Sequence, residues 1–192
     1  FLIHYLSVYY FFVEKFVKLI YDDKSFEFPL IKGSQNEKAI DIKNLRKETG
    51  LITLDPGYKN SGSCKSEITF LDGEKGVLKY RGYSIEDLAK KSSFLEVSYL
   101  LIFGNLPTKD QLSKFKTDIE NESIIDEDLK VILKSFPKSS HPMGILASLT
   151  SALTAFNPTA LDIKSEDEMY KAIVMIMAKF PILCAWTQRK VK

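Results

Sequence analysis

The chain has 192 residues, enough to bury a substantial core in one large domain or two small ones. Hydrophobic residues make up 45% and charged residues 27%, a composition that excludes a disordered protein. The 27 Lys and Arg residues nearly balance the 25 Asp and Glu residues, which argues against nucleic acid as the main partner. Cys64 and Cys184 lie far apart, so we expect neither a disulfide framework nor a thiolate zinc site, and a reducing cytoplasm fits best.

Residues 1–16 differ in composition from the rest of the chain. Aromatic and aliphatic side chains dominate, but His4 and Ser7 interrupt the run, which ends at Glu14-Lys15. It is too short for a membrane-spanning helix and lacks the basic region and cleavage site of a secretory signal. We interpret it as an apolar leader, the tail of a truncated segment or translated upstream sequence, with a membrane anchor as the alternative.

Residues 17–83 predict a small β-rich domain. Two β-prone runs flank Asp22-Asp23-Lys24 and predict a hairpin. Residues 39–50 predict a short strand and a short helix that Gly50 ends. A second hairpin is expected within residues 63–83, with its turn at Asp72-Gly73.

Residues 84–192 predict a helical array. Helix-capping pairs are found at Ser84 with Asp87, Thr108 with Gln111, and Ser165 with Glu168. Further helices are expected over residues 93–104, 126–136 and 142–156, and Pro181 is expected to kink or end the last helix. The predicted fold is therefore mainly α: a small β-rich N-terminal unit followed by a helical array.

Few residues suggest chemistry. The sequence contains no phosphate-binding glycine loop, no zinc-protease motif and no serine-hydrolase motif. The acidic groups Asp22-Asp23 and 126–128 are interpreted as solvated surface. The Arg81–Tyr83 stretch is expected either to hold an anion or to bind nearby carbonyl groups, and Cys184 is expected to be a small core residue.

His141 has two interpretations. An imidazole near a helix N-terminus resists protonation because the helix dipole disfavours the cation, which suits a neutral donor to an oxyanion. Alternatively, the residue only begins the helix that continues with Pro142.

Four stretches, taken in order, resemble the citrate synthase family. They are DPGYKNSGSCKSEITFLDGEKGVLKYRGYSIEDLA, FLEVSYLLIFGNLPT, SHPM and AKFP. The β-rich unit before the helices makes the bacterial type II form the best match, and the resemblance covers residues 17–192. It implies a large helical domain of that family, begun but not completed over residues 84–192.

The resemblance also implies a reaction, in which acetyl-CoA and oxaloacetate condense and citryl-CoA is hydrolysed to citrate and CoA. In the family an Asp and two His residues act by acid–base and electrostatic catalysis, without metal or cofactor. Those residues are expected beyond residue 192, so no catalytic, cofactor-binding or metal residue is assigned here, and His141 is expected to begin a helix of the supporting body. The resemblance further implies a cytoplasmic homo-oligomer, a dimer or hexamer, without nucleic acid or membrane partners.

Two alternatives to a citrate synthase fragment remain. One is a fragment of a 2-methylcitrate synthase, and the other is a non-catalytic assembly module or pseudogene remnant.

The resemblance also bears on regulation. In type II relatives inhibited by NADH, the stretch matching Asn121–Ile124 supplies Arg-His-Thr-Met to the nucleotide site, and Met175 matches an Arg, whereas Lys179 is retained. The complete enzyme is therefore expected to bind NADH weakly.

Overall fold

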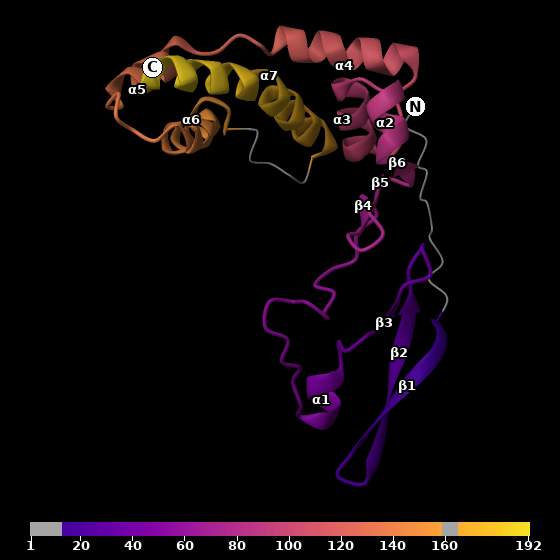
Figure 1. Ribbon diagram of the computed structural model, residues 1–192. Helices are drawn as coiled ribbons and strands as arrows, with labels where there is room; N and C mark the ends of the chain where they lie inside the picture. Colours follow the sequence, from indigo (N-terminus) through magenta and orange to yellow (C-terminus); the bar gives the residue numbers. More distant parts are fainter. Residues whose placement is uncertain (1–12, 159–164) are drawn as a thin grey trace. The chain divides into compact units, whose positions relative to one another are not determined.

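The computed structural model describes residues 13–158 and 165–192 (Figure 1). Most of the predicted apolar leader, residues 1–12, lies outside the described residues. The chain divides into two compact units, one ending at Ser66 and one beginning at Glu67, and each is described by itself. The predicted domain ranges, 17–83 and 84–192, stay a prediction.

The first unit contains a three-stranded antiparallel sheet in the order β1-β2-β3. Its strands are β1 (Val13–Tyr21), β2 (Lys24–Lys32) and β3 (Lys38–Ile40), and the hairpin predicted around Asp22-Asp23 is confirmed. Both turn residues have positive φ, 48° and 56°, as a two-residue type I′ turn requires, and Asp tolerates this conformation better than most residues.

The start of β1 differs from the prediction. The strand begins at Val13, four residues before the first residue of the predicted hairpin. The reason lies in the partner strand: β2 continues to Lys32 and provides cross-strand partners for Lys15 and Phe16. The helix α1 (Leu45–Thr49) contacts β2, and its Leu45 is buried, as is Phe28 of β2.

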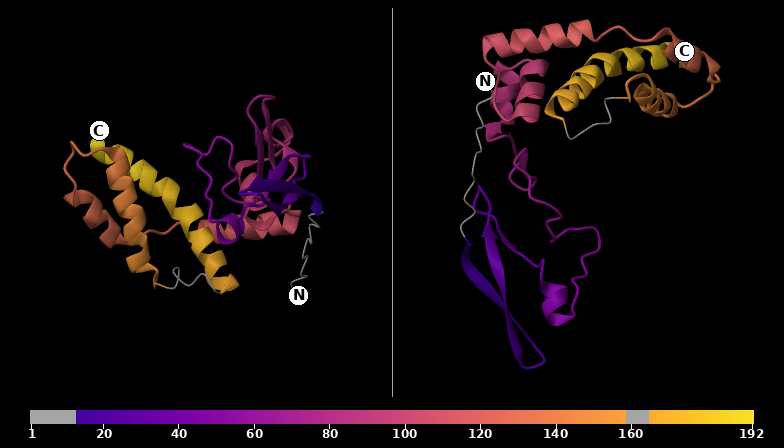
Figure 2. Two further views of the ribbon diagram at one scale, coloured as in Figure 1. Left: turned by 90° about the horizontal axis from the view of Figure 1, so that it is seen from below. Right: turned by 180° about the vertical axis from the view of Figure 1, so that it is seen from behind.

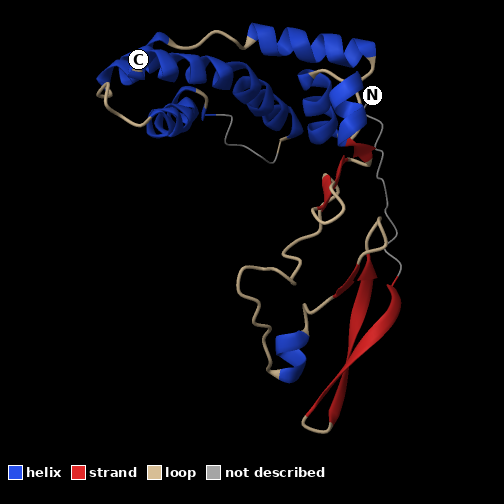
Figure 3. Cartoon of the chain, in the orientation of Figure 1, coloured by secondary structure: helices blue, strands red, loops and turns tan. Residues whose placement is uncertain are grey.

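The second unit begins with a small antiparallel sheet, β4 (Thr69–Asp72), β5 (Val77–Tyr80) and β6 (Tyr83–Ser84) (Figure 3). The predicted hairpin is confirmed, although its left-handed residue is Gly76 rather than Gly73. The Asp72 carboxylate accepts a hydrogen bond from the Lys75 backbone N–H at 3.0 Å and shapes the turn.

Among the described residues of the second unit, six helices follow, and each corresponds to a predicted one. They are α2 (Ile85–Lys91), α3 (Phe94–Phe103), α4 (Lys109–Asn121), α5 (Glu127–Ser135), α6 (Pro142–Phe156) and α7 (Glu166–Val191). Ser84, Thr108 and Ser165 all accept the expected capping hydrogen bonds from the backbone. The mainly α fold with small N-terminal sheets is therefore confirmed.

Pro181 was expected to kink or end the last helix, and the structure excludes the second of these, because α7 continues through it. Proline lacks the N–H that would bond the carbonyl of Met177, so this turn has one hydrogen bond fewer. Ala178 and Leu183 on either side are buried, and α7 packs against α4, α5 and α6 (Figure 2). Tertiary packing thus offsets the lost bond, which the local sequence does not reveal.

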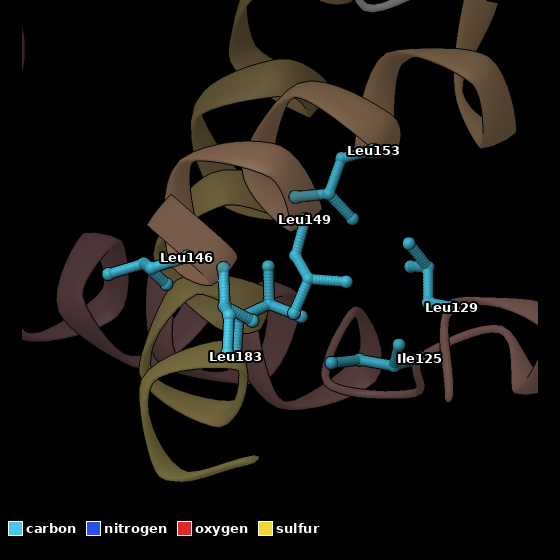
Figure 4. Packing of buried hydrophobic residues seen from close by; sticks show 7 residues of the cluster. Ile125, Leu129, Leu146, Leu149, Leu153 and Leu183 are labelled. Atoms are coloured by element: carbon cyan, nitrogen blue, oxygen red, sulfur yellow. The ribbon is translucent and has the colours of Figure 1, made fainter. Parts of the chain in front are cut away.

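An apolar cluster of buried residues joins α5, α6 and α7 (Figure 4). Its buried members are Ile125, Leu129, Ile145, Leu146, Leu149, Leu153 and Leu183. Burial of each such side chain contributes about 1.5–3 kcal/mol to the free energy of folding. The cluster is the main source of stability that holds these three helices together.

By length and composition, α7 is also apolar enough to cross a membrane, with 26 residues and a mean hydropathy of 1.5 in its most apolar window. Among the described residues it is the only such helix. Val174, Ala178 and Leu183 are buried against other helices of the unit. We therefore interpret α7 as the core helix of this unit.

Two glycine substitutions are expected to have opposite effects on stability. Gly104 ends α3 with φ of 90°, so Gly104→Ala should destabilise the chain by about 1–2 kcal/mol through backbone strain. Gly144 lies inside α6 with open space around its Cα, so Gly144→Ala should stabilise by about 0.5–1 kcal/mol. Urea unfolding of both variants measures the difference, and equal effects would contradict the conformational argument.

Candidate functional site

His141 lies at the N-cap of α6, where its exposed ring caps the helix. Its Nδ1 atom accepts a hydrogen bond from the Met143 backbone N–H at 3.2 Å, and Pro142 occupies the first helical position. This satisfies one of the free N–H groups of the first turn. The structure therefore places His141 as a helix-initiating residue, as the sequence predicted.

Arg81 binds a carbonyl group. Its guanidinium Nη2 donates to the Leu101 backbone oxygen at 3.0 Å, and Nη1 lies 4.0 Å from the Glu67 carboxylate. Leu101 lies in the last turn of α3, where carbonyl groups lack partners within the helix. Arg81 and Gly82 both have positive φ and form the two-residue turn between β5 and β6. Of the two predicted roles, the structure supports the contact with a carbonyl.

The acidic groups and cysteines occupy the positions that the sequence predicted. Asp22 and Asp23 are exposed at the hairpin turn, and Asp126 caps α5 by accepting from the Asp128 N–H at 2.9 Å. Cys184 is half-buried against the main apolar cluster, and Cys64 is exposed. Within the described ranges, 13–158 and 165–192, no three His, Cys, Asp or Glu residues are grouped so that they could hold a metal ion.

The most unusual polar residue in the second unit is Lys179 of α7. Its side chain is only 8% exposed, and its Nζ donates to the Glu122 backbone oxygen at 3.0 Å and to the Glu122 carboxylate at 3.1 Å. Glu122 lies at the C-cap of α4, where the negative end of the helix dipole also favours a cation. A buried ammonium group must be paired and hydrogen-bonded, and Glu122 provides both.

A cavity of about 250 Å³ adjoins this pair. It is lined by Ile124, Asp126, Leu129, Phe156, Asn157 and Lys179. Two of the features that sequence comparison associated with a nucleotide site, the stretch 121–124 and Lys179, therefore do meet in space. Met175, one turn before Lys179, is buried. The Lys179 charge is already bound by a carboxylate of the chain itself, which leaves a poor setting for an anion.

A second polar cluster joins α4 to α7. The Tyr170 hydroxyl donates to Asp118 Oδ2 at 2.5 Å, and Lys114 Nζ contacts the same oxygen at 2.5 Å. Hydrogen bonds from Lys114 and then from Tyr170 lower the pKa of Asp118, while burial and then the Asp118 carboxylate raise the pKa of Tyr170. The Lys114–Asp118 spacing of four residues indicates a helix-surface pair, but nothing in the sequence points to Tyr170.

Breaking the Glu122–Lys179 pair is expected to destabilise the chain. Glu122→Gln removes the charge that compensates a buried ammonium group and should cost about 1–3 kcal/mol in urea unfolding. Lys179→Met replaces that group by an apolar side chain of similar length and should be tolerated within about 1 kcal/mol. The control Glu127→Gln breaks the exposed Lys130–Glu127 pair and should change stability by less than about 0.5 kcal/mol. Equal losses for both glutamine variants would show that burial of Lys179 is unimportant.

The Asp118 cluster predicts a pH dependence. Because its pKa is lowered in the folded state, Asp118 stabilises the fold above the unfolded pKa of about 3.9, and this contribution is lost as pH falls through the folded value. Asp118→Asn should therefore lose less stability than the wild type between pH 7 and pH 3. Tyr170→Phe, which removes one of the two donors, should lie between them. Urea unfolding at both pH values tests this, and identical pH dependence of all three proteins would refute it.

Comparison with known proteins adds the family context. The family described as "Citrate synthase, C-terminal domain" matches residues 57–192. The citrate synthase of Corynebacterium glutamicum is 44% identical over 171 residues, which is 89% of this chain and 39% of that protein. The chain thus spans about two fifths of the length of this curated relative.

Similar solved structures belong to the same family. The citrate synthase of Pyrobaculum aerophilum superimposes with a TM-score of 0.63 at 29% identity over 74% of this chain and 39% of its own. The citrate synthase of Thermotoga maritima superimposes with a TM-score of 0.59 at 29% identity, over 72% of this chain and 35% of its own. A third structure is the citrate synthase of Thermoplasma acidophilum in a ternary complex with carboxymethyl coenzyme A and oxaloacetate. It superimposes with a TM-score of 0.65 over 72% of this chain and 36% of its own, and its 23% identity supports the fold alone. The chain belongs to the citrate synthase family.

Proposed function

We propose that the protein of which these residues are part is a citrate synthase that condenses acetyl-CoA with oxaloacetate to form citrate and CoA, in the tricarboxylic acid cycle. The observation that carries the proposal is the 44% identity to the Corynebacterium glutamicum citrate synthase over 89% of this chain. The citrate synthases of Pyrobaculum aerophilum and Thermotoga maritima, both 29% identical to this chain, support the same assignment.

The residues described here would serve as part of the helical body. In this structure His141 caps a helix, Arg81 binds a carbonyl, and Cys184 packs against a core. The acid, the base and the groups that hold oxaloacetate are therefore proposed to lie in other segments of the complete enzyme. Catalysis there would be acid–base and electrostatic.

We further propose the bacterial type II form. The family match begins at residue 57, and the elements β1, β2, β3 and α1 precede it as an additional unit. Exposed apolar side chains on the helices, among them Val131, Ile176 and Phe180, support burial against further protein in a homo-oligomer, a dimer or hexamer. A cytoplasmic location is part of the proposal and fits the two free cysteines.

The complete protein should release CoA from acetyl-CoA in the presence of oxaloacetate, measured with a thiol reagent. The 192-residue chain, assayed in parallel, should show no release above background, because the proposed acid and base are absent from it. A higher kcat/KM with propionyl-CoA than with acetyl-CoA would favour the alternative, a 2-methylcitrate synthase. No turnover of either substrate would support a non-catalytic module, and activity of the short chain would contradict the proposed placement of the catalytic groups.

The Glu122–Lys179 pair supports a proposal about regulation of the type II enzyme. In the NADH-inhibited relatives that this chain resembles, the positions of Asn121 and Glu122 hold Arg and His. Here Glu122 places a carboxylate 3.1 Å from Lys179 Nζ. A pyrophosphate would therefore lose cationic partners, each worth about 1.5–3 kcal/mol, and would meet a negative charge.

The complete enzyme should consequently show only weak inhibition by NADH, relieved by acetyl-CoA with simple competition. The measurement is an NADH titration at low salt and subsaturating acetyl-CoA. The double variant Asn121→Arg with Glu122→His should be more sensitive to NADH than the wild type, whereas the control Glu127→Gln should not. Sigmoidal inhibition of the wild type at micromolar NADH would refute the proposal.

A further inference from the structure

We draw no further inference here: the strongest candidate, the outward face of the β1-β2-β3 sheet, on which the exposed side chains of Phe16 and Ile20 flank the Lys18–Glu27 ion pair, carries nothing because no feature of the structure shows what covers it.

Discussion

Burial of one face of α7 is the constraint on which the packing of α4, α5 and α6 depends. Helices as short as α5, with nine residues, are not stable alone in water, because nucleation costs more than a few hydrogen bonds return. Val174, Ala178 and Leu183 are buried along α7, which contacts α4, α5 and α6. α4, α5 and α6 thus gain stability from the area that they cover on this one long helix. Continuation of α7 through Pro181 follows from the same constraint, since ending the helix there would remove Leu183 from the cluster.

Local features of the fold were predictable from the sequence because their causes are local. The capping residues Ser84, Thr108 and Ser165 act within three residues, and the Asp22-Asp23 turn acts between adjacent strands. Two element boundaries were not predicted from the sequence, and both have one cause. The start of β1 at Val13 depends on how far β2 extends, and passage of α7 through Pro181 depends on three packed helices. Neither is encoded within a short window of sequence.

The polar sites were less predictable than the fold. Tyr170 and Asp118 are 52 residues apart, and Lys179 and Glu122 are 57 apart, so both pairs depend on how α7 packs against α4. Resemblance to relatives did associate residues 121–124 with Lys179, but as groups around a bound nucleotide. It did not indicate that the side chains of Glu122 and Lys179 bind each other. The roles of His141 and Arg81 were among the predicted alternatives, since a helix start and a tight turn can be recognised locally.

The buried charge of Lys179 connects the stability of the fold with the proposal about NADH. An ammonium group that is only 8% exposed needs a counter-charge, because its hydration has been lost. That counter-charge comes either from a bound anion, which makes the site responsive to a ligand, or from the chain itself. In this chain Glu122 supplies it from the C-terminus of α4, and the partial negative charge of the helix end reinforces it. An anionic ligand would have to displace the Glu122 carboxylate, which is part of the same fold. Among the described contacts, Lys179 would then keep only the Glu122 backbone carbonyl as a hydrogen-bond acceptor. If the proposal about NADH is right, a single acidic residue at this position would both stabilise the fold and weaken nucleotide binding by the same electrostatic contact.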